Sequence, residues 1–560
     1  MKYRILIPLA AAGLVALFWA VAQPAPPPMA SLFPPGAALY LEAKDLGALL
    51  ADWNASAEKV AWLDSDNYEA FSRSQLFLKL SDAQTQFATA AGVPPDYALL
   101  TSVAGSGSAL AMYDIGKLEC LYMTKVASAR AINTALWRAR GTYQTRHAGN
   151  ADYFVKEDPP SHRVAAFAYV GDTLVLATKE SLIAGALQLM ARDSVPSMAS
   201  EPWFTSSVQA AGAGQSELRL VYNMAALGRT YQFRSHWVQG NVGELRQFSS
   251  GLTDLESARG EIRERRVLLR ATPSASSESA ESIAGQALAA VPDDAGLYRA
   301  WLRPSGGQVA ALMEEKLFPA AISTAPKSKL APMVAQTADA GSEIDLESRI
   351  DEQPLGQRND AVQLLRDALV AAKIDTMLDV QSTKIDADRV YVRPHFAIAL
   401  LTAADWNASA IRAAIGSAAE GLWAQGAAAT WRSGPNGVSE LDGLGKVAMA
   451  VQGKWLVVGD SAEMVNAVFS RRNRQAIPGA AYAAGWRHAR ELPNFRRLTT
   501  LIDFPQVPAE TEQPAGAEPP FFSGNLASFG AVLKRVDMAS IIVHDAGTML
   551  REAVVYRMIP

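Results

Sequence analysis

Apolar residues follow two different periods along the first half of the chain. Leu46, Leu49, Leu50 and Trp53 recur at helical spacing, and 179–190 carries a second apolar stripe of that period. Short apolar runs typical of strands lie at 39–42, 109–113, 118–124, 142–146, 153–156, 164–169, 173–177, 219–222 and 267–270. These strands come in runs punctuated by separate helices. The pattern therefore predicts an α+β fold with largely antiparallel sheets and disfavours a doubly wound fold.

The second half of the chain repeats landmarks of the first half in the same order. The strand at 35–41 resembles 292–298, the strand ending at Thr124 resembles the one ending at Thr402, and 164–187 resembles 446–469. The offset grows from 257 to 278 to 282 residues, so the second copy must carry an insertion. A polar stretch without steady periodicity at 320–360 supplies it. We interpret the body of the chain as two tandem, structurally related modules.

This interpretation divides the chain into an N-terminal segment, a spacer and two modules. The predicted boundaries are 1–22 for a signal peptide or membrane anchor, 23–34 for a Pro-rich tether, 35–271 for module copy 1, 272–289 for a linker and 290–560 for module copy 2, with its polar insertion at 320–360.

The N-terminal segment predicts the compartment. Lys2 and Arg4 precede 18 uncharged residues from Ile5 to Ala22, which as a helix would span about 27 Å, just under the thickness of a bilayer core. A small-x-small site ending at Ala22 would also suit a signal peptidase, so a cleaved signal peptide and a retained anchor both stay open. Positive charge stays on the cytoplasmic side, so we expect the modules on the periplasmic side of the inner membrane.

The amino-acid composition limits the kinds of partner and site that we expect. The 560 residues include 52 basic and 56 acidic side chains and are 49% hydrophobic, which predicts ample core and gives no basic surface for nucleic acid. The one cysteine, Cys120, excludes an intrachain disulfide and any cysteine-built metal site. Matched to Ile398 in the second copy, Cys120 is expected to be a small buried apolar residue.

The order of elements resembles exported bacterial domain-of-unknown-function proteins that open with a Pro-x-x-Ala-Leu-Tyr strand just past a signal sequence. Here the motif ends at Leu39 and Tyr40, and the hydrophobic hairpin running into a helix at 167–189 fits the same pattern. The resemblance implies a role in the cell envelope and supplies no site residues.

Several short motifs suggest chemistry, and each has a simpler interpretation. Gly459-Asp460-Ser461-Ala462 resembles the start of a GDS-type hydrolase block, but the matching Ala177-Thr178-Lys179-Glu180 has no serine, so we expect Asp460 or Ser461, and Thr178, to cap helices. The glycine-rich 104–108 precedes a strand, the wrong order for a phosphate cradle. Asp64-Ser65-Asp66-Asn67 begins like a calcium loop but has Glu69 where glycine is required, and is expected to cap a helix near Tyr68.

The titratable residues form no metal-ligand pattern. The histidines are at least 15 residues apart, at His147, His162, His236, His395, His488 and His544. The acidic run at 343–352 is expected to be a solvated loop. We therefore predict no catalytic, cofactor-binding or metal residues.

These observations favour a non-catalytic exported protein, tethered to the membrane, that binds or scaffolds another envelope component. The alternative is a periplasmic binder of a small molecule or lipid in a groove between the two lobes. A hydrolase using Ser461 with a distant histidine and aspartate is the third hypothesis. The expected partners are the membrane, through the N-terminal segment, and an envelope protein or lipid.

Overall fold

The computed structural model describes residues 28–73, 75–94, 96–126, 133–191, 195–212, 216–229, 246–258, 260–317, 360–385, 392–420, 430–442, 446–494 and 535–559. The chain forms two compact units. The first unit comprises the chain up to Asn54 together with Gln75–Asp254, and the second comprises Ala55–Ser74 together with Leu255–Pro560. The predicted signal or anchor segment, the polar insertion and His236 lie outside the described residues.

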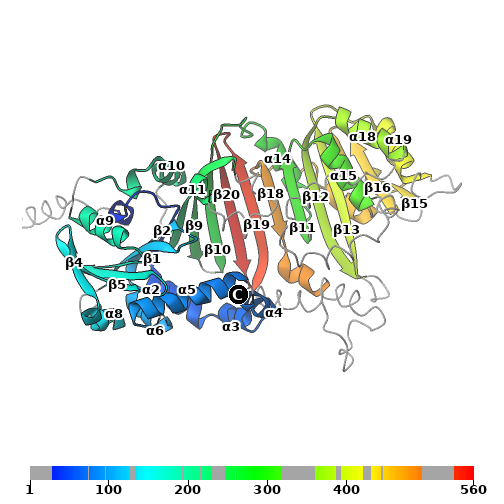
Figure 1. The fold of residues 1–560 in the computed structure, drawn as a ribbon. Helices are drawn as coiled ribbons and strands as arrows, with labels where there is room; N and C mark the ends of the chain where they lie inside the picture. Colours follow the sequence, from blue (N-terminus) through cyan, green and yellow to red (C-terminus); the bar gives the residue numbers. More distant parts are fainter. Residues whose placement is uncertain are drawn as a thin grey trace, which may run out of the picture. The chain divides into compact units, whose positions relative to one another are not determined.

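The first unit is built on an antiparallel sheet whose strands pair in the order β8–β1–β2–β3–β7–β6–β5–β4. Figure 1 labels β1, β2, β4 and β5 of this sheet. Their bounds are β1 Leu39–Asp45, β2 Ser106–Asp114, β3 Glu119–Lys125, β4 Gln144–Ala148, β5 Ala151–Asp158, β6 Arg163–Val170, β7 Thr173–Ala177 and β8 Leu218–Asn223. The division between the units falls inside β9 (Phe248–Ala258).

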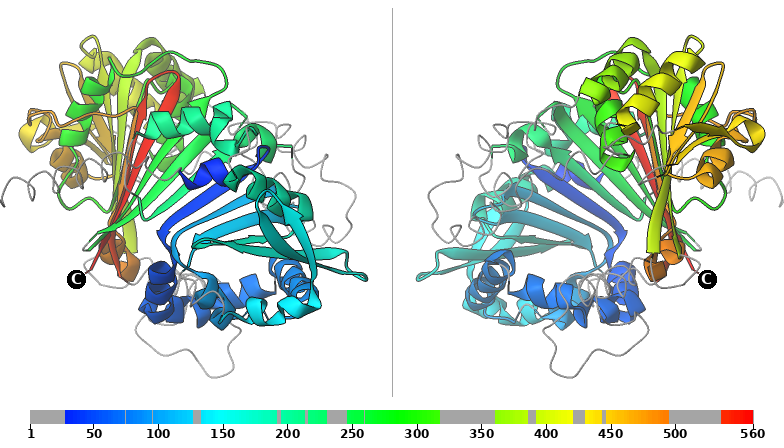
Figure 2. Two further views of the ribbon diagram at one scale, coloured as in Figure 1. Left: turned by 90° about the vertical axis from the view of Figure 1, so that its left-hand side faces the viewer. Right: turned by 90° about the vertical axis from the view of Figure 1, so that its right-hand side faces the viewer.

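Helices cover both faces of this sheet (Figure 2). One face packs against η1 (Met29–Leu32), α9 (Glu180–Met190), η3 (Met198–Ser200) and α10 (Pro202–Ala211) around fully buried Tyr40 and Ile183. The other face packs against α5 (Gln75–Ala91), α6 (Tyr97–Val103) and α8 (Ala135–Ala139) around Phe167. The shorter elements α11 (Met224–Leu227) and η2 (Arg140–Thr142) complete the unit, together with α2 (Leu46–Ala55).

The predicted apolar stripe of the first helix does not become core. No residue of α2 is buried, and the side chain of Trp53 is 48% exposed. The helix itself is where the periodicity predicts it, but its apolar face is not packed into either core cluster of the unit.

The second unit has a second antiparallel sheet, in which the strands pair in the order β18–β11–β12–β13–β17–β16–β15–β14. Their bounds are β11 Leu297–Leu302, β12 Ile374–Ile385, β13 Val392–Thr402, β14 Trp431–Ser433, β15 Ser439–Asp442, β16 Lys446–Gln452, β17 Trp455–Gly459 and β18 Tyr482–Trp486. Beyond β18 the sheet continues through β19 (Val536–Asp545) and β20 (Met549–Met558) to β10 (Glu261–Arg270).

Helices cover both faces of the second sheet as well. α14 (Glu281–Ala289) and α20 (Ala462–Phe469) pack on one face, and α15 (Gly306–Leu317), α18 (Asp360–Ala371) and α19 (Ala408–Glu420) pack on the other. The short helices α3 (Ala57–Leu63), α4 (Asp66–Ser72) and η5 (Pro435–Gly437) also belong to this unit. All the described strand pairings are antiparallel, so the predicted α+β class with largely antiparallel sheets is confirmed.

The strand pairings show which positions of the first sheet correspond to which positions of the second sheet. Tyr40 of β1 lies between Ala111 and Val221, as Tyr298 of β11 lies between Val380 and Gly485. This is an offset of 258 residues from 40 to 298, where the sequence predicted 257. In β3 and β13, Leu121 pairs with Ala177 as Ala397 pairs with Gly459, an offset of 276 from 121 to 397.

The predicted partner of Cys120 is therefore wrong by two residues. Cys120 is equivalent to Phe396, and not to Ile398, because each lies one residue before the paired position that fixes the register. A shift of two residues keeps a strand residue on the same face of its sheet. Under either assignment, the counterpart of Cys120 in β13 is an apolar residue. Sequence similarity alone did not resolve the shift.

The structure also corrects the predictions for the tether at 23–34 and the linker at 272–289. Within the predicted tether, Met29–Leu32 form a 3-10 helix and Phe33 is fully buried against Tyr40, so the end of this segment is core and not an extended spacer. Within the predicted linker 272–289, Glu281–Ala289 form α14, whose Ala284 and Ala287 are buried. Apolar side chains at helical spacing outweighed the Pro- and Ser-rich composition nearby.

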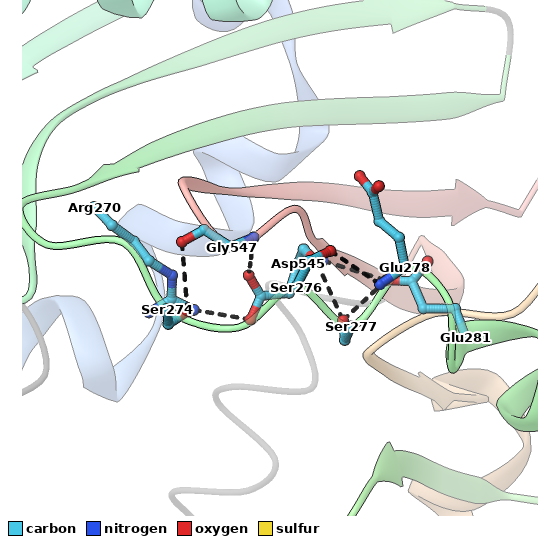
Figure 3. A network of polar contacts seen from close by, with 8 residues as sticks. All are labelled: Arg270, Ser274, Ser276, Ser277, Glu278, Glu281, Asp545 and Gly547. Atoms are coloured by element: carbon cyan, nitrogen blue, oxygen red, sulfur yellow. Dashed lines mark hydrogen bonds and ion pairs between the residues drawn. The ribbon is translucent and has the colours of Figure 1, made fainter.

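The serine-rich part of the predicted linker is fastened to the turn between β19 and β20 (Figure 3). The amide of Ser274 donates to the carbonyl of Gly547 at 2.9 Å, and the amide of Ser277 donates to the carbonyl of Asp545 at 3.0 Å. Arg270 Nη2 lies 2.9 Å from Asp545 Oδ2. These bonds fix the path of residues 270–281 within the second unit.

Candidate functional site

An apolar cavity of about 260 Å³ lies inside the first unit, between the sheet and the helices α5, α6 and α8. Its walls come from β3, β6 and β7 on the sheet side and from the three helices on the other. The lining residues are Phe87, Ala88, Ala91, Val93, Leu99, Cys120, Tyr122, Leu136, Val164, Ala165, Ala166, Phe167, Leu176, Ala177 and Thr178. The cavity is the best candidate for a binding site in the described chain.

Aromatic rings close one end of the cavity. Phe167 is 2% exposed and stacks on Phe154 with ring centroids 5.1 Å apart, while Tyr143 meets Phe167 edge-on at the same distance. Leu136 and Val93 are buried beside them. Rings packed in this way are held in fixed orientations, so this end of the cavity is a rigid wall.

The other end of the cavity is partly open to solvent. Cys120, Val164 and Ala165 lie near the ends of β3 and β6, Thr178 directly follows β7, and all four residues are half-buried. We call these four residues the rim. Because Ala165 has a one-carbon side chain, it leaves the space above β6 unfilled between the rim and Phe167.

The polar atoms of the walls are bound to the protein itself. The hydroxyl of Thr178 accepts from the amide of Cys120 at 2.8 Å and donates to the carbonyl of Leu118 at 2.7 Å. The hydroxyl of Tyr122 donates to the carbonyl of Val103 at 3.0 Å. With these groups satisfied, the cavity presents mostly carbon surface, which favours an apolar ligand over a polar one.

The thiol of Cys120 is not a good nucleophile in this setting. Burial raises its pKa, because the thiolate would lose solvation, and a hydrogen bond with Thr178 opposes that effect only in part. A thiol with a raised pKa stays protonated at neutral pH. Cys120 was expected to be a buried apolar residue, but it is half-buried and lines the cavity with a protonated thiol.

Thr178 does not cap the helix that follows it, so that prediction is wrong. The first residue before α9 is Lys179, and its side chain makes no capping hydrogen bond. The hydroxyl of Thr178 is instead used to bind β3. Asp460, its equivalent in the second unit, makes the same kind of bond: its Oδ1 accepts from the amide of Phe396 at 2.9 Å.

Ser461 is the N-cap of α20, as predicted. Its hydroxyl accepts from the amide of Met464 at 3.1 Å. His395 Nδ1 lies 3.1 Å from Asp460 Oδ2, but no hydrogen bond among the described residues joins this histidine to Ser461. Burial raises the pKa of Asp460, against the opposing effects of the Phe396 amide and His395. The arrangement has an acid–histidine pair without a serine nucleophile bound to it.

The remaining candidates lie apart from one another. Ser65 caps α4 by accepting from the amide of Tyr68 at 3.1 Å, which confirms the capping prediction there. His147 and His162 pair with neighbouring acids on the surface, His544 binds Glu281, and His488 is buried with Nδ1 3.1 Å from the carbonyl of Val536. Within the described ranges, no group of three or more His, Cys, Asp or Glu is placed to hold a metal ion.

The part of the chain that the structure describes contains no helix long and apolar enough to cross a bilayer. The predicted anchor at 1–22 lies outside the described residues and stays a prediction.

No family model and no curated protein matches the chain. Among solved structures, the chain is similar to three crystal forms of TP0453. Form I is 12% identical with a TM-score of 0.25 and covers 44% of this chain and 79% of TP0453. Form III is 10% identical with a TM-score of 0.24 (44% and 81%), and form IV is 10% identical with a TM-score of 0.25 (43% and 79%). Similarity at this level carries no functional argument.

Sequence reasoning missed the cavity. The small residues that leave the space are Ala88 and Ala91 on α5 and Ala165 on β6, and their neighbours in the sequence do not mark them: Ala91 lies between Ala90 and Gly92. Alanine is ordinary in both helices and strands, so only the packing of α5 over β6 shows that these positions leave a space.

Proposed function

We propose that this chain is a non-catalytic exported binding protein built from two tandem related modules, and that the first module binds an apolar small molecule or acyl chain. The cavity of about 260 Å³, with its carbon-lined walls, is the observation that carries the proposal. Cavities of about 150 Å³ lined by aliphatic and aromatic side chains hold benzene, so this one has room for roughly ten carbon atoms.

The energetics of such a ligand are favourable. Burying ten methylene groups is worth about 8 kcal/mol at roughly 0.8 kcal/mol each, before the cost of association is subtracted. The expected affinity is therefore micromolar or weaker for a simple chain. That range suits a protein that picks up and releases its ligand.

The common pairing order of the two sheets supports the tandem modules. Eight strands of each unit pair in the same order, from β8 to β4 and from β18 to β14. We take residues 35–271 and 290–560 as the two copies. The basic flank and apolar run at 1–22 favour a location on the periplasmic side of the inner membrane, with the membrane as one partner.

The test is binding of a neutral, fluorescent apolar probe of ten carbon atoms, 1-aminonaphthalene, to the purified exported chain. Wild type is expected to enhance the fluorescence of the probe at one site. Ala165→Phe is expected to abolish that binding, because the new ring occupies the space between the rim and Phe167.

The matched control is Ala225→Phe, an exposed position on α11 of the same unit, which should bind the probe like wild type. A well-folded Ala165→Phe protein that still binds the probe with unchanged affinity would show that the cavity is not the site. Absence of binding by wild type would overturn the proposal altogether.

A further inference from the structure

We infer that the ligand of the first module is a medium-length monocarboxylate, with its chain in the cavity and its carboxylate on Arg163. This inference rests on the proposed binding function and adds the chemical class of the ligand. It is carried by the position and contacts of Arg163, which sits beside an otherwise apolar site.

The strand β6 places Arg163 on the face of the sheet that forms the cavity. Ala165 and Phe167 both line the cavity, and side chains two residues apart lie on the same face of a strand. Arg163 continues this row, about 7 Å beyond Ala165, at the rim end. The row therefore runs from a cation, through a small residue that leaves space, to the aromatic wall.

The contacts of the guanidinium agree with this placement. Its central carbon lies 5.1 Å from the ring centroid of Phe87, which lines the cavity. Nε donates to Gln86 Oε1 at 2.9 Å and Nη1 donates to the carbonyl of Lys117 at 2.6 Å. These bonds hold the head group at the edge of the cavity and leave Nη2 without a hydrogen bond to any described residue.

Asp158 lies directly opposite Arg163 in the β5–β6 pairing, but its carboxylate is not within ion-pair distance of the guanidinium. The nearby acids are engaged elsewhere: Glu119 pairs with Lys179 at 2.7 Å, Asp158 accepts from Ser161, and Glu157 lies 3.2 Å from His162. No carboxylate among the described residues forms an ion pair with Arg163. A half-buried guanidinium whose Nη2 has no hydrogen bond to a described residue is complementary to an anionic head group, and a carboxylate oxygen can accept from that nitrogen.

The size of the cavity limits the chain. Room for roughly ten carbon atoms fits a chain of medium length better than a full-length lipid acyl chain. The best candidates are unbranched acids of about eight to ten carbons, because the cavity extends along the strands from the rim to Phe167.

The experiment compares decanoate with 1-decanol by titration calorimetry on the purified exported chain. Wild type is expected to bind decanoate about tenfold or more tightly than decanol, as a charge-assisted hydrogen bond provides. Arg163→Gln should remove this preference while decanol binding stays within about twofold of wild type. Arg163→Lys should retain part of it, and the matched control Arg138→Gln, an exposed arginine on α8, should retain all of it.

The outcomes separate the two proposals. Equal binding of decanoate and decanol by wild type, or an undiminished preference in a folded Arg163→Gln protein, overturns the carboxylate and leaves the apolar site standing. Failure of decanol, decanoate and 1-aminonaphthalene alike overturns the binding function itself. Decanol binding by Arg163→Gln also shows that the variant has folded, since the cavity exists only in the folded unit.

Discussion

The two units pair their strands in the same order, but the helices on one face of each sheet pack differently against it. In the first unit, the wall formed by β3, β6 and β7 borders the cavity. In the second unit, the equivalent wall of β13, β16 and β17 is covered by α15, α18 and α19, with Leu365, Leu369 and Ile415 fully buried against it. One backbone arrangement thus supports a hollow face in one place and a packed face in another.

Side-chain size at equivalent positions explains the difference. The register of the strands matches Ala165 to Val447, Tyr122 to Ile398 and Cys120 to Phe396. Val447 and Ile398 are buried in the core of the second unit. Phe396 is 8% exposed with Lys316 Nζ 5.5 Å from its ring, so an aromatic side chain occupies the place where the first unit has its rim.

The covering helices differ as well. In the second unit, an ion pair between Arg366 of α18 and Glu314 of α15 joins the two helices. Lys316 Nζ of α15 lies 2.5 Å from Oδ1 of the fully buried Asp379 of β12. In the first unit, α5 presents Ala88 and Ala91 to the cavity. The comparison teaches that a site arises where small residues meet on both layers, without any change in strand topology.

The largest expected effect comes from opening a hole in the packed face. Leu365→Ala should reduce the free energy of unfolding of the second unit by about 2–5 kcal/mol, since it leaves a new cavity among fully buried side chains. Leu99→Ala, which enlarges a cavity that already exists, should cost the first unit about 1 kcal/mol. Hydrogen exchange by mass spectrometry, followed on β12–β13 and on β2–β3, measures the two units separately. Equal losses would contradict the contrast between the faces.

An intermediate effect is expected from exchanging the equivalent small and large residues. Ala165→Val should stabilise the first unit by about 0.5–1 kcal/mol, because it fills part of a cavity. Val447→Ala in the second unit should destabilise that unit by about 1–3 kcal/mol. The same exchange measurement reports both changes. Destabilisation by Ala165→Val would mean that the space at Ala165 is required for packing and is not free for a ligand.

The smallest expected effect is a pH dependence confined to the second unit. Burial raises the pKa of Asp460, so the folded unit binds this proton more tightly than the unfolded chain. The stability that the protonated carboxyl contributes is present below the unfolded pKa, near 4, and is lost as the pH rises through the folded pKa. Asp460→Asn should remove this dependence, and the first unit, with Thr178 at the equivalent position, should lack it.

Unfolding measured between pH 3 and 7 checks this result. Parallel stability profiles for wild type and Asp460→Asn over that range would show that the carboxyl titrates alike in the folded and unfolded chain. The amide of asparagine can still accept from Phe396, so loss of that bond does not confuse the comparison.

The sequence by itself determined the features that depend on neighbouring residues. The apolar periods predicted the α+β class, the strands β1 to β8 and β10, and the helices α2, α9 and α20, because each pattern reflects one face of a local element, but they missed β9. Ser65 and Ser461 were predicted as caps because a cap needs only a hydroxyl and an amide three residues away.

Only the tertiary structure decided what depends on distant residues. The register between β3 and β13 differs by two from the sequence match, Thr178 binds a neighbouring strand in place of its own helix, and α14 lies where a linker was expected. The cavity exists because Ala88, Ala91 and Ala165 face one another across two layers. Alanine carries no signal of its own along the chain, so a space between layers becomes visible only when the layers are packed together.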